Sequence, residues 1–146
     1  MTSQLRSEHS LQADTAFLLA RANAHSLTAA NAALAPLGLR VRSFSVLALA
    51  VDEGRLSQRD IAEYLRLDPS QVVALVDDLQ ERHLVTREPD PTDRRAKVVI
   101  ATGAGRKLHE EAAEATRRAL DAMLGGLQAE ERAVLRALLT RLAFPA

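Results

Sequence analysis

The stretch that decides the fold is residues 57–83, which read SQRDIAEYLRLDPSQVVALVDDLQERH. It contains two start signals for helices. Ser57 is a favoured N-cap residue, and Asp60 stands three residues later in a weak capping-box arrangement. Asp68 is the second N-cap, and Pro69 takes the first helical position after it. The stretch is therefore predicted to form two helices joined by a turn of two or three residues.

The apolar residues of this stretch recur at helical spacing. In the first helix they are Ile61, Ala62 and Leu65, and Leu67 is expected to close that helix. In the second helix they stand at i, i+3, i+4 and i+7, which predicts a buried stripe of Val72, Leu75, Val76 and Leu79. Together the two helices form a predicted helix-turn-helix.

A β-hairpin is predicted directly after the second helix. Residues 84–88 have the pattern of a strand, residues 89–95 form a turn with two prolines, and residues 96–101 are β-branched and return. A hairpin in this position, with cations at its tip, is typical of a wing. The cations are Arg94, Arg95 and Lys97.

Helices are predicted on both sides of this region. Their expected ranges are 11–34, 41–51, 105–124 and 129–143, and the last carries a stripe of leucines. The first ends at Pro36 and Gly38, because proline disfavours helix before it and glycine readily takes a positive φ. We therefore expect a mainly α fold with a small β-hairpin wing, within one domain over residues 1–146.

Composition sets the class of protein. The chain has 146 residues, 47% hydrophobic content, no cysteine and no net charge, with 19 basic and 19 acidic residues. This excludes a disordered chain, a disulfide framework and a cysteine nucleophile. No apolar run approaches the ~20 residues that span a bilayer. We expect a soluble cytoplasmic protein that makes no membrane contact.

The second helix of a helix-turn-helix enters the major groove of DNA. Its predicted outward face is Ser70, Ala74, Asp77 and Glu81, flanked by Gln71, Val73 and Asp78. Gln71 can bond adenine, Ser70 a base or a phosphate, and Val73 or Ala74 a thymine methyl group. The alternative is a capped helix whose short side chains only face solvent.

The wing cations suit a narrow minor groove or phosphates. Arg94, Arg95 and Lys97 are the expected contacts, and Arg59 and Arg66 on the preceding helix are expected to hold the DNA backbone. The alternative is a solvated charged turn. Asp93 beside the cations is expected to orient an arginine.

Other motifs point away from catalysis. His83 follows the second helix where a positive φ is needed, and it is interpreted as structural. Residues 103–107 lack the ending of a phosphate-binding loop and are interpreted as a strand-to-helix turn. The histidines have no acidic partners at metal spacing, so no metal and no cofactor are predicted.

The order of these elements resembles the MarR (multiple antibiotic resistance regulator) family of bacterial transcription factors. The most specific matching residues lie in and after the wing: Asp93-x-Arg95, then Val99, then Thr102-x-x-Gly105. Ala101 stands where the family usually has leucine. The Leu37-Gly38-Leu39 segment and residues 128–132 also resemble family positions.

The resemblance implies a homodimer built from helices 11–34 and 105–143. It implies a DNA-binding lobe at 55–102, with the helix-turn-helix at 57–83 and the wing at 84–101, that binds a palindromic operator in double-stranded DNA. Arg95 would be the minor-groove residue. The resemblance further implies a repressor released by a small effector, often aromatic and anionic.

The chain departs from the family in the second helix of the helix-turn-helix. Val73-Ala74 replaces a common Thr-Arg, Asp78 replaces a basic residue, and no cation precedes Arg82. This helix should therefore contribute little phosphate neutralisation. A protein-interaction module with weak DNA binding is the main alternative, and a small enzyme is a third hypothesis that no motif supports.

Overall fold

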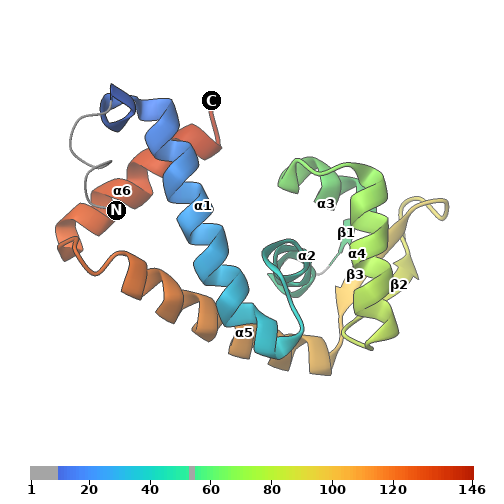
Figure 1. The fold of residues 1–146 in the computed structure, drawn as a ribbon. Helices are drawn as coiled ribbons and strands as arrows, with labels where there is room; N and C mark the ends of the chain where they lie inside the picture. The colour runs from blue at the N-terminus through green and yellow to red at the C-terminus, as the bar shows by residue number, and fades with distance from the viewer. Residues whose placement is uncertain (1–9, 53–54) are drawn as a thin grey trace. The chain divides into compact units, whose positions relative to one another are not determined.

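The structure is a computed structural model that describes residues 10–52 and 55–146 (Figure 1). The chain divides into two compact units. Unit 1 consists of the described part of Met1–Ala29 together with Arg117–Ala146, and unit 2 is Ala30–Thr116.

The fold is mostly helical with a small antiparallel sheet, as the sequence predicts. The helices and strands, in chain order with two short 3₁₀ helices marked η, are η2 (Ser10–Ala13), α1 (Thr15–Leu34), η3 (Ala35–Leu37), α2 (Val41–Asp52), β1 (Leu56–Ser57), α3 (Gln58–Leu65), α4 (Pro69–Glu81), β2 (Val85–Pro89), β3 (Lys97–Ala101), α5 (Gly103–Met123) and α6 (Ala129–Ala143).

Two predicted helix starts were wrong by a few residues, and each has a local cause. The first long helix begins at Thr15 instead of residue 11, because the Asp14 carboxylate accepts a hydrogen bond from the backbone N–H of Phe17. Helix α5 begins at Gly103 instead of residue 105, since the Thr102 hydroxyl accepts from the Gly105 N–H. The predicted stop after α1 is confirmed by Gly38, whose φ is +68°.

The helix-turn-helix is confirmed as α3 and α4. The Ser57 hydroxyl accepts from the Asp60 N–H at 3.0 Å, and the Asp60 carboxylate accepts from the Ser57 N–H at 3.1 Å. Helix α3 ends at Leu65, so the expectation that Leu67 closes it was wrong. The reason is that Arg66 takes a left-handed conformation with a φ of +55° and breaks the helix there.

The wing is confirmed as the β2–β3 hairpin, whose antiparallel register runs from Val85↔Ala101 to Pro89↔Lys97. Each strand starts one residue later than predicted. A third strand, β1, pairs with β3 through Leu56↔Val99, which gives the sheet order β1-β3-β2. The sequence did not predict β1, because two residues are too short to show an alternating pattern.

The hydrophobic core lies in unit 2, where α2, α3, α4, the sheet and the first half of α5 pack together. Helix α4 buries Val72, Val76 and Leu79 as predicted, whereas Leu75 is only half-buried. Phe44 of α2 stacks on His109 of α5 with ring centroids 5.6 Å apart. The fully buried larger side chains are Leu34, Leu39, Val46, Leu47, Ile61, Val72, Val76, Leu79, Val85, Val98 and Val99.

Unit 1 is built from the first part of α1, the end of α5 and α6. No described side chain of this unit is buried. Arg132 joins the two C-terminal helices by donating to the backbone carbonyls of Leu124 at 2.9 Å and Leu127 at 3.2 Å. The turn between α5 and α6 is therefore held, while the apolar faces of the helices stay open.

Within residues 10–52 and 55–146, no single helix is long and apolar enough to cross a membrane. The bent pair Thr15–Leu37 and Val41–Asp52, with an angle of 71° between its halves, passes the same test by length and composition.

Candidate nucleic-acid interface

The predicted reading residues lie on the exposed face of α4. Ser70, Gln71, Val73 and Ala74 are all exposed, and the side chain of Val73 is 40% accessible. They face outward because Val72, Val76 and Leu79, on the opposite side of α4, are buried in the core. The Gln71 side-chain oxygen accepts from the Asp68 N–H at 3.1 Å, which leaves its amide nitrogen to donate to a base.

The wing loop is held by two aspartates. Asp90 accepts from the backbone N–H of Thr92 at 2.9 Å and from its hydroxyl at 2.8 Å. These hydrogen bonds lower the pKa of the Asp90 carboxyl. Asp93 accepts from the backbone N–H of Arg95 at 3.0 Å. Asp93 therefore fixes the backbone of the turn that carries the arginines.

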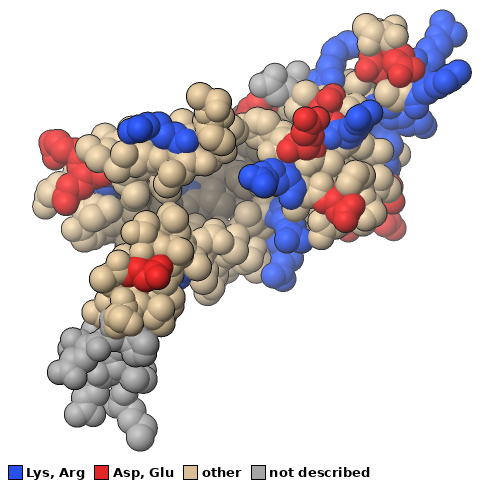
Figure 2. Space-filling model, turned by 90° about the horizontal axis from the view of Figure 1, so that it is seen from above, with Lys and Arg blue, Asp and Glu red and all other residues tan. Residues whose placement is uncertain are grey.

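The cations of the wing are available for a ligand. Arg94, Arg95 and Lys97 are exposed, and among the described residues no hydrogen bond or ion pair holds their side chains. Figure 2 shows Lys and Arg side chains gathered over the β2–β3 loop, at the far right of the view, with acidic side chains beside them. Arg59 of α3 and Arg66, directly after it, are exposed in the same unit.

The wing signature after β3 has a structural cause. The Thr102 hydroxyl donates to the His83 carbonyl at 2.7 Å and accepts from the Gly105 N–H at 3.0 Å. A Cβ on Gly105 would lie 2.0 Å from the Leu84 carbonyl oxygen, so only glycine can stand there. His83 has a φ of +60°, which confirms the positive φ predicted there.

Sequence reasoning missed Arg87. This residue of β2 places its guanidinium against α3 and α4 instead of into solvent, with its side chain 16% exposed. The signal was present, because period-two alternation from buried Val85 puts Arg87 on the inner face of the strand. Within the part of the chain that the structure describes, no three His, Asp or Glu side chains cluster as a metal site.

Comparison with known proteins identifies the family. Residues 37–96 match the model of the MarR family. A transcriptional regulator of the MarR family from Rhodococcus sp. RHA1 is 42% identical, covers 95% of this chain and 99% of its own, and superposes with a TM-score of 0.89. CouR from Rhodococcus jostii RHA1, solved with p-coumaroyl-CoA bound, is 43% identical over 95% of this chain and 98% of its own, with a TM-score of 0.85.

A curated relative is also similar. The HTH-type transcriptional repressor NicR of Pseudomonas putida is 30% identical over 99 residues, which are 68% of this chain. The match spans 63% of the length of NicR. The likeness to the first Rhodococcus regulator extends over nearly the whole of both chains, with the helix-turn-helix and the wing included. The chain belongs to the MarR family of transcriptional regulators.

Proposed function

We propose that this protein is a cytoplasmic, homodimeric repressor that binds a palindromic operator and has no catalytic role. The observation that carries the proposal is that unit 2 combines an exposed α4 face with a wing whose three cations have no partner among the described residues. Neither cofactor nor metal has a part in this mechanism.

The proposed contacts divide between bases and phosphates. Ser70, Gln71, Val73 and Ala74 would meet base edges in the major groove, as the first turns of a recognition helix do. Arg94, Arg95 and Lys97 would enter the minor groove or neutralise phosphates. Arg59 and Arg66 would hold the sugar-phosphate backbone. In this scheme, residues 55–102 form the DNA-binding lobe.

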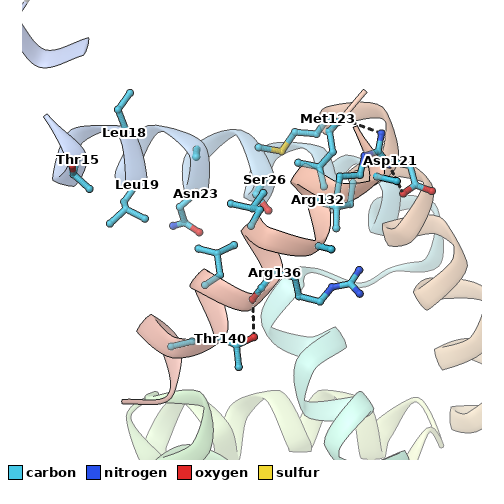
Figure 3. A pocket seen from close by; sticks show the side chains of 18 of the residues that line it. Thr15, Leu18, Leu19, Asn23, Ser26, Asp121, Met123, Arg132, Arg136 and Thr140 are labelled. Carbon is cyan, nitrogen blue, oxygen red and sulfur yellow. Dashed lines mark hydrogen bonds and ion pairs between the residues drawn. The ribbon is translucent and has the colours of Figure 1, made fainter. Parts of the chain in front are cut away.

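The open faces of unit 1 support the homodimer. A largely apolar groove of about 1100 Å³ lies between α1 and α6 and the end of α5 (Figure 3). Leu19 and Leu139 line it, and they are 46% and 43% exposed. A contiguous exposed apolar surface on a folded protein commonly marks an interface with another chain. We assign helices 11–34 and 105–143 to dimerisation, with a second copy of the chain covering the groove.

The proposed effector is a small aromatic anion. This part of the proposal is supported by CouR, which is 43% identical and was solved with p-coumaroyl-CoA bound, an aromatic and anionic ligand. An effector that binds the DNA-free state more tightly would release the operator by shifting the population. Adding p-coumaroyl-CoA to the protein–DNA complex should therefore lower DNA affinity, whereas free coenzyme A at the same concentration is the control.

A second function is favoured by one observation. The exposed side of α4 carries Asp77, Asp78 and Glu81 and no cation before Arg82, which suits a protein partner better than a polyanion. This alternative makes the chain a winged-helix protein-interaction module with weak, salt-insensitive DNA binding.

The salt dependence of DNA binding separates the two functions. A dimer has six wing cations. If they neutralise phosphates, a plot of the logarithm of the DNA-binding constant against the logarithm of the salt concentration should have a slope of about −5. Fluorescence anisotropy with a labelled genomic fragment, between about 0.05 and 0.2 M salt, measures this slope. A slope near zero would contradict the repressor and favour the protein-interaction module.

A further inference from the structure

A partly buried arginine links the two parts of the proposed DNA interface. The guanidinium of Arg87 donates from Nε to the Gln58 side-chain oxygen at 2.7 Å and from Nη1 to that of Gln80 at 2.7 Å. Its Nη2 contacts the Asp77 carboxylate at 2.5 Å and the Val73 carbonyl at 3.3 Å. We call Arg87 with these four partners the Arg87 cluster.

The cluster joins three elements. Arg87 stands in the strand that leads to the wing loop, Gln58 is the first residue of α3, and the remaining partners are on α4. Val73, whose carbonyl is bound, is itself a proposed base contact. A planar guanidinium with donors directed at several acceptors fixes orientation more strictly than a single contact can. The cluster therefore sets the wing strand relative to the reading helix.

The cluster also controls charge on the reading helix. The Asp77 side chain is 62% exposed, on the face of α4 that we assign to DNA, whereas the Arg87 side chain is only 16% exposed. A carboxylate there would repel phosphates if it were alone. Arg87 supplies the opposite charge from the protein side, so that α4 can approach the polyanion without a cation of its own.

We propose that Arg87 is a positioning residue for DNA recognition, which neutralises Asp77 and holds α4 in register with the wing. This inference rests on the proposed function. It explains how Asp77, one of the three acidic side chains that α4 exposes, is kept from repelling phosphates. Arg87 acts through Asp77 and Val73, without a DNA contact of its own.

The test uses the full-length protein and two DNA probes. One probe is the tightest-binding genomic fragment recovered by the wild-type protein, and the other has the same base composition in shuffled order. The variants are Arg87→Gln, Asp77→Asn and the double variant. The matched control is Arg82→Gln, because Arg82 also ties α4 to other elements, through the Gly38 and Leu37 carbonyls at 2.8 and 3.1 Å, but makes no described ion pair with an acid. Circular dichroism fixes an assay temperature at which every variant is folded.

Arg87→Gln should weaken binding to both probes at least tenfold, roughly the strength of a charge-assisted contact. Arg82→Gln should change it less than about threefold, within the usual range for a residue away from an interface. The double variant should regain affinity for the shuffled probe, because the unpaired carboxylate is gone. Its preference for the genomic fragment should stay reduced, because the wing and α4 are no longer held in register.

Asp77→Asn is the variant that keeps the proposal testable if Arg87→Gln fails to fold. It leaves the Arg87 charge uncompensated and so raises the charge of the interface by one per protomer. Binding should therefore tighten at low salt, and the gain should shrink at high salt because the attraction is screened. Unchanged or weaker binding by Asp77→Asn would overturn the proposal. Unchanged binding by folded Arg87→Gln, or full probe preference in the double variant, would overturn it as well. If the wild-type protein binds both probes equally, the proposed function itself fails.

Discussion

The two units of this protein use similar apolar residues in opposite ways. Every buried hydrophobic side chain of the described residues lies in unit 2, between Leu34 and Ala112. All of the exposed large hydrophobic side chains except Tyr64 and Val73 lie in unit 1. Unit 2 therefore has its own core, whereas unit 1 leaves its leucines open along α1, α5 and α6.

This difference shows where each unit obtains its stability. Burying apolar surface contributes roughly 25 cal/mol per Å², and unit 2 gains this within one chain. The described residues of unit 1 bury no hydrophobic side chain, and we propose that this unit gains the same stabilisation when a second copy of the chain covers its apolar groove. Substitutions in unit 2 should therefore act on folding, whereas substitutions on the open faces of unit 1 should act on association.

The largest effect is expected from Gly105→Ala in unit 2. The new methyl carbon would lie 2.0 Å from the Leu84 carbonyl oxygen, so the backbone at the start of α5 must move. Overpacking of this severity should lower the free energy of unfolding by about 3 kcal/mol or more. Urea denaturation followed by circular dichroism measures the change.

Gly103→Ala is the matched control, because a Cβ there meets nothing within 4 Å. Equal stability of the two alanine variants would contradict the close approach of Gly105 to the β2 end of the sheet.

A smaller but distinct effect is expected from Leu139→Asp in unit 1. Leu139 is 43% exposed and lines the apolar groove, so a charge there should weaken the dimer by about 2 kcal/mol or more per protomer, as for a central interface residue. Sedimentation equilibrium should show monomers at micromolar concentration. Leu139→Met keeps the surface apolar and should stay dimeric. A Leu139→Asp protein that remains fully dimeric would show that the groove is not the interface.

The wing prediction concerns the exposed cations of unit 2. Arg95→Ala should weaken DNA binding by about 1–3 kcal/mol across sequences and reduce the salt slope by about 1 for each phosphate that is no longer neutralised. Anisotropy titrations at fixed salt measure the dissociation constant, and thermal unfolding should be unchanged because the Arg95 side chain has no described partner. An unchanged dissociation constant would refute the minor-groove role.

The smallest effect is a pH dependence of the wing loop. Hydrogen bonds from Thr92 lower the pKa of Asp90 below its ordinary value of 3.8, so the folded turn favours the ionised carboxylate. This contribution to stability is present above pH 3.8 and is lost as the pH falls through the lowered folded pKa. Titration of the Asp90 carboxyl by NMR should show the lowered pKa. Thr92→Ala removes the hydroxyl but keeps the backbone N–H, so it should return the pKa part of the way toward 3.8. The same pKa in both proteins would contradict the contribution of the Thr92 hydroxyl.

Much of unit 2 could be predicted from sequence because its signals are local. Caps such as Ser57 and Asp68 act within three residues, and the β2–β3 hairpin follows from alternation and a proline-rich turn. Strand β1 could not be predicted, because it exists only through its pairing with β3. The left-handed conformation of Arg66 could not be predicted either, because the usual signal for a positive φ at the end of a helix is glycine and none stands there.

The candidate site was predicted less completely than the fold. Exposure of Ser70, Ala74 and the wing cations follows from periodicity, since they stand opposite the buried stripe or at a turn. The role of Arg87 was not predicted, because its partners come from two helices, α3 and α4, that meet β2 only in the tertiary fold. Contacts with the bases themselves remain a prediction.

We propose that unit 2 reads DNA while unit 1 pairs two copies of the chain. The most direct measurement is selection of genomic fragments by the purified protein at about 0.15 M salt, a concentration at which nonspecific binding is weak. We expect recovery of a short palindrome with half-sites about one helical turn apart, as a symmetric dimer requires. Recovery of fragments without a shared sequence would contradict it.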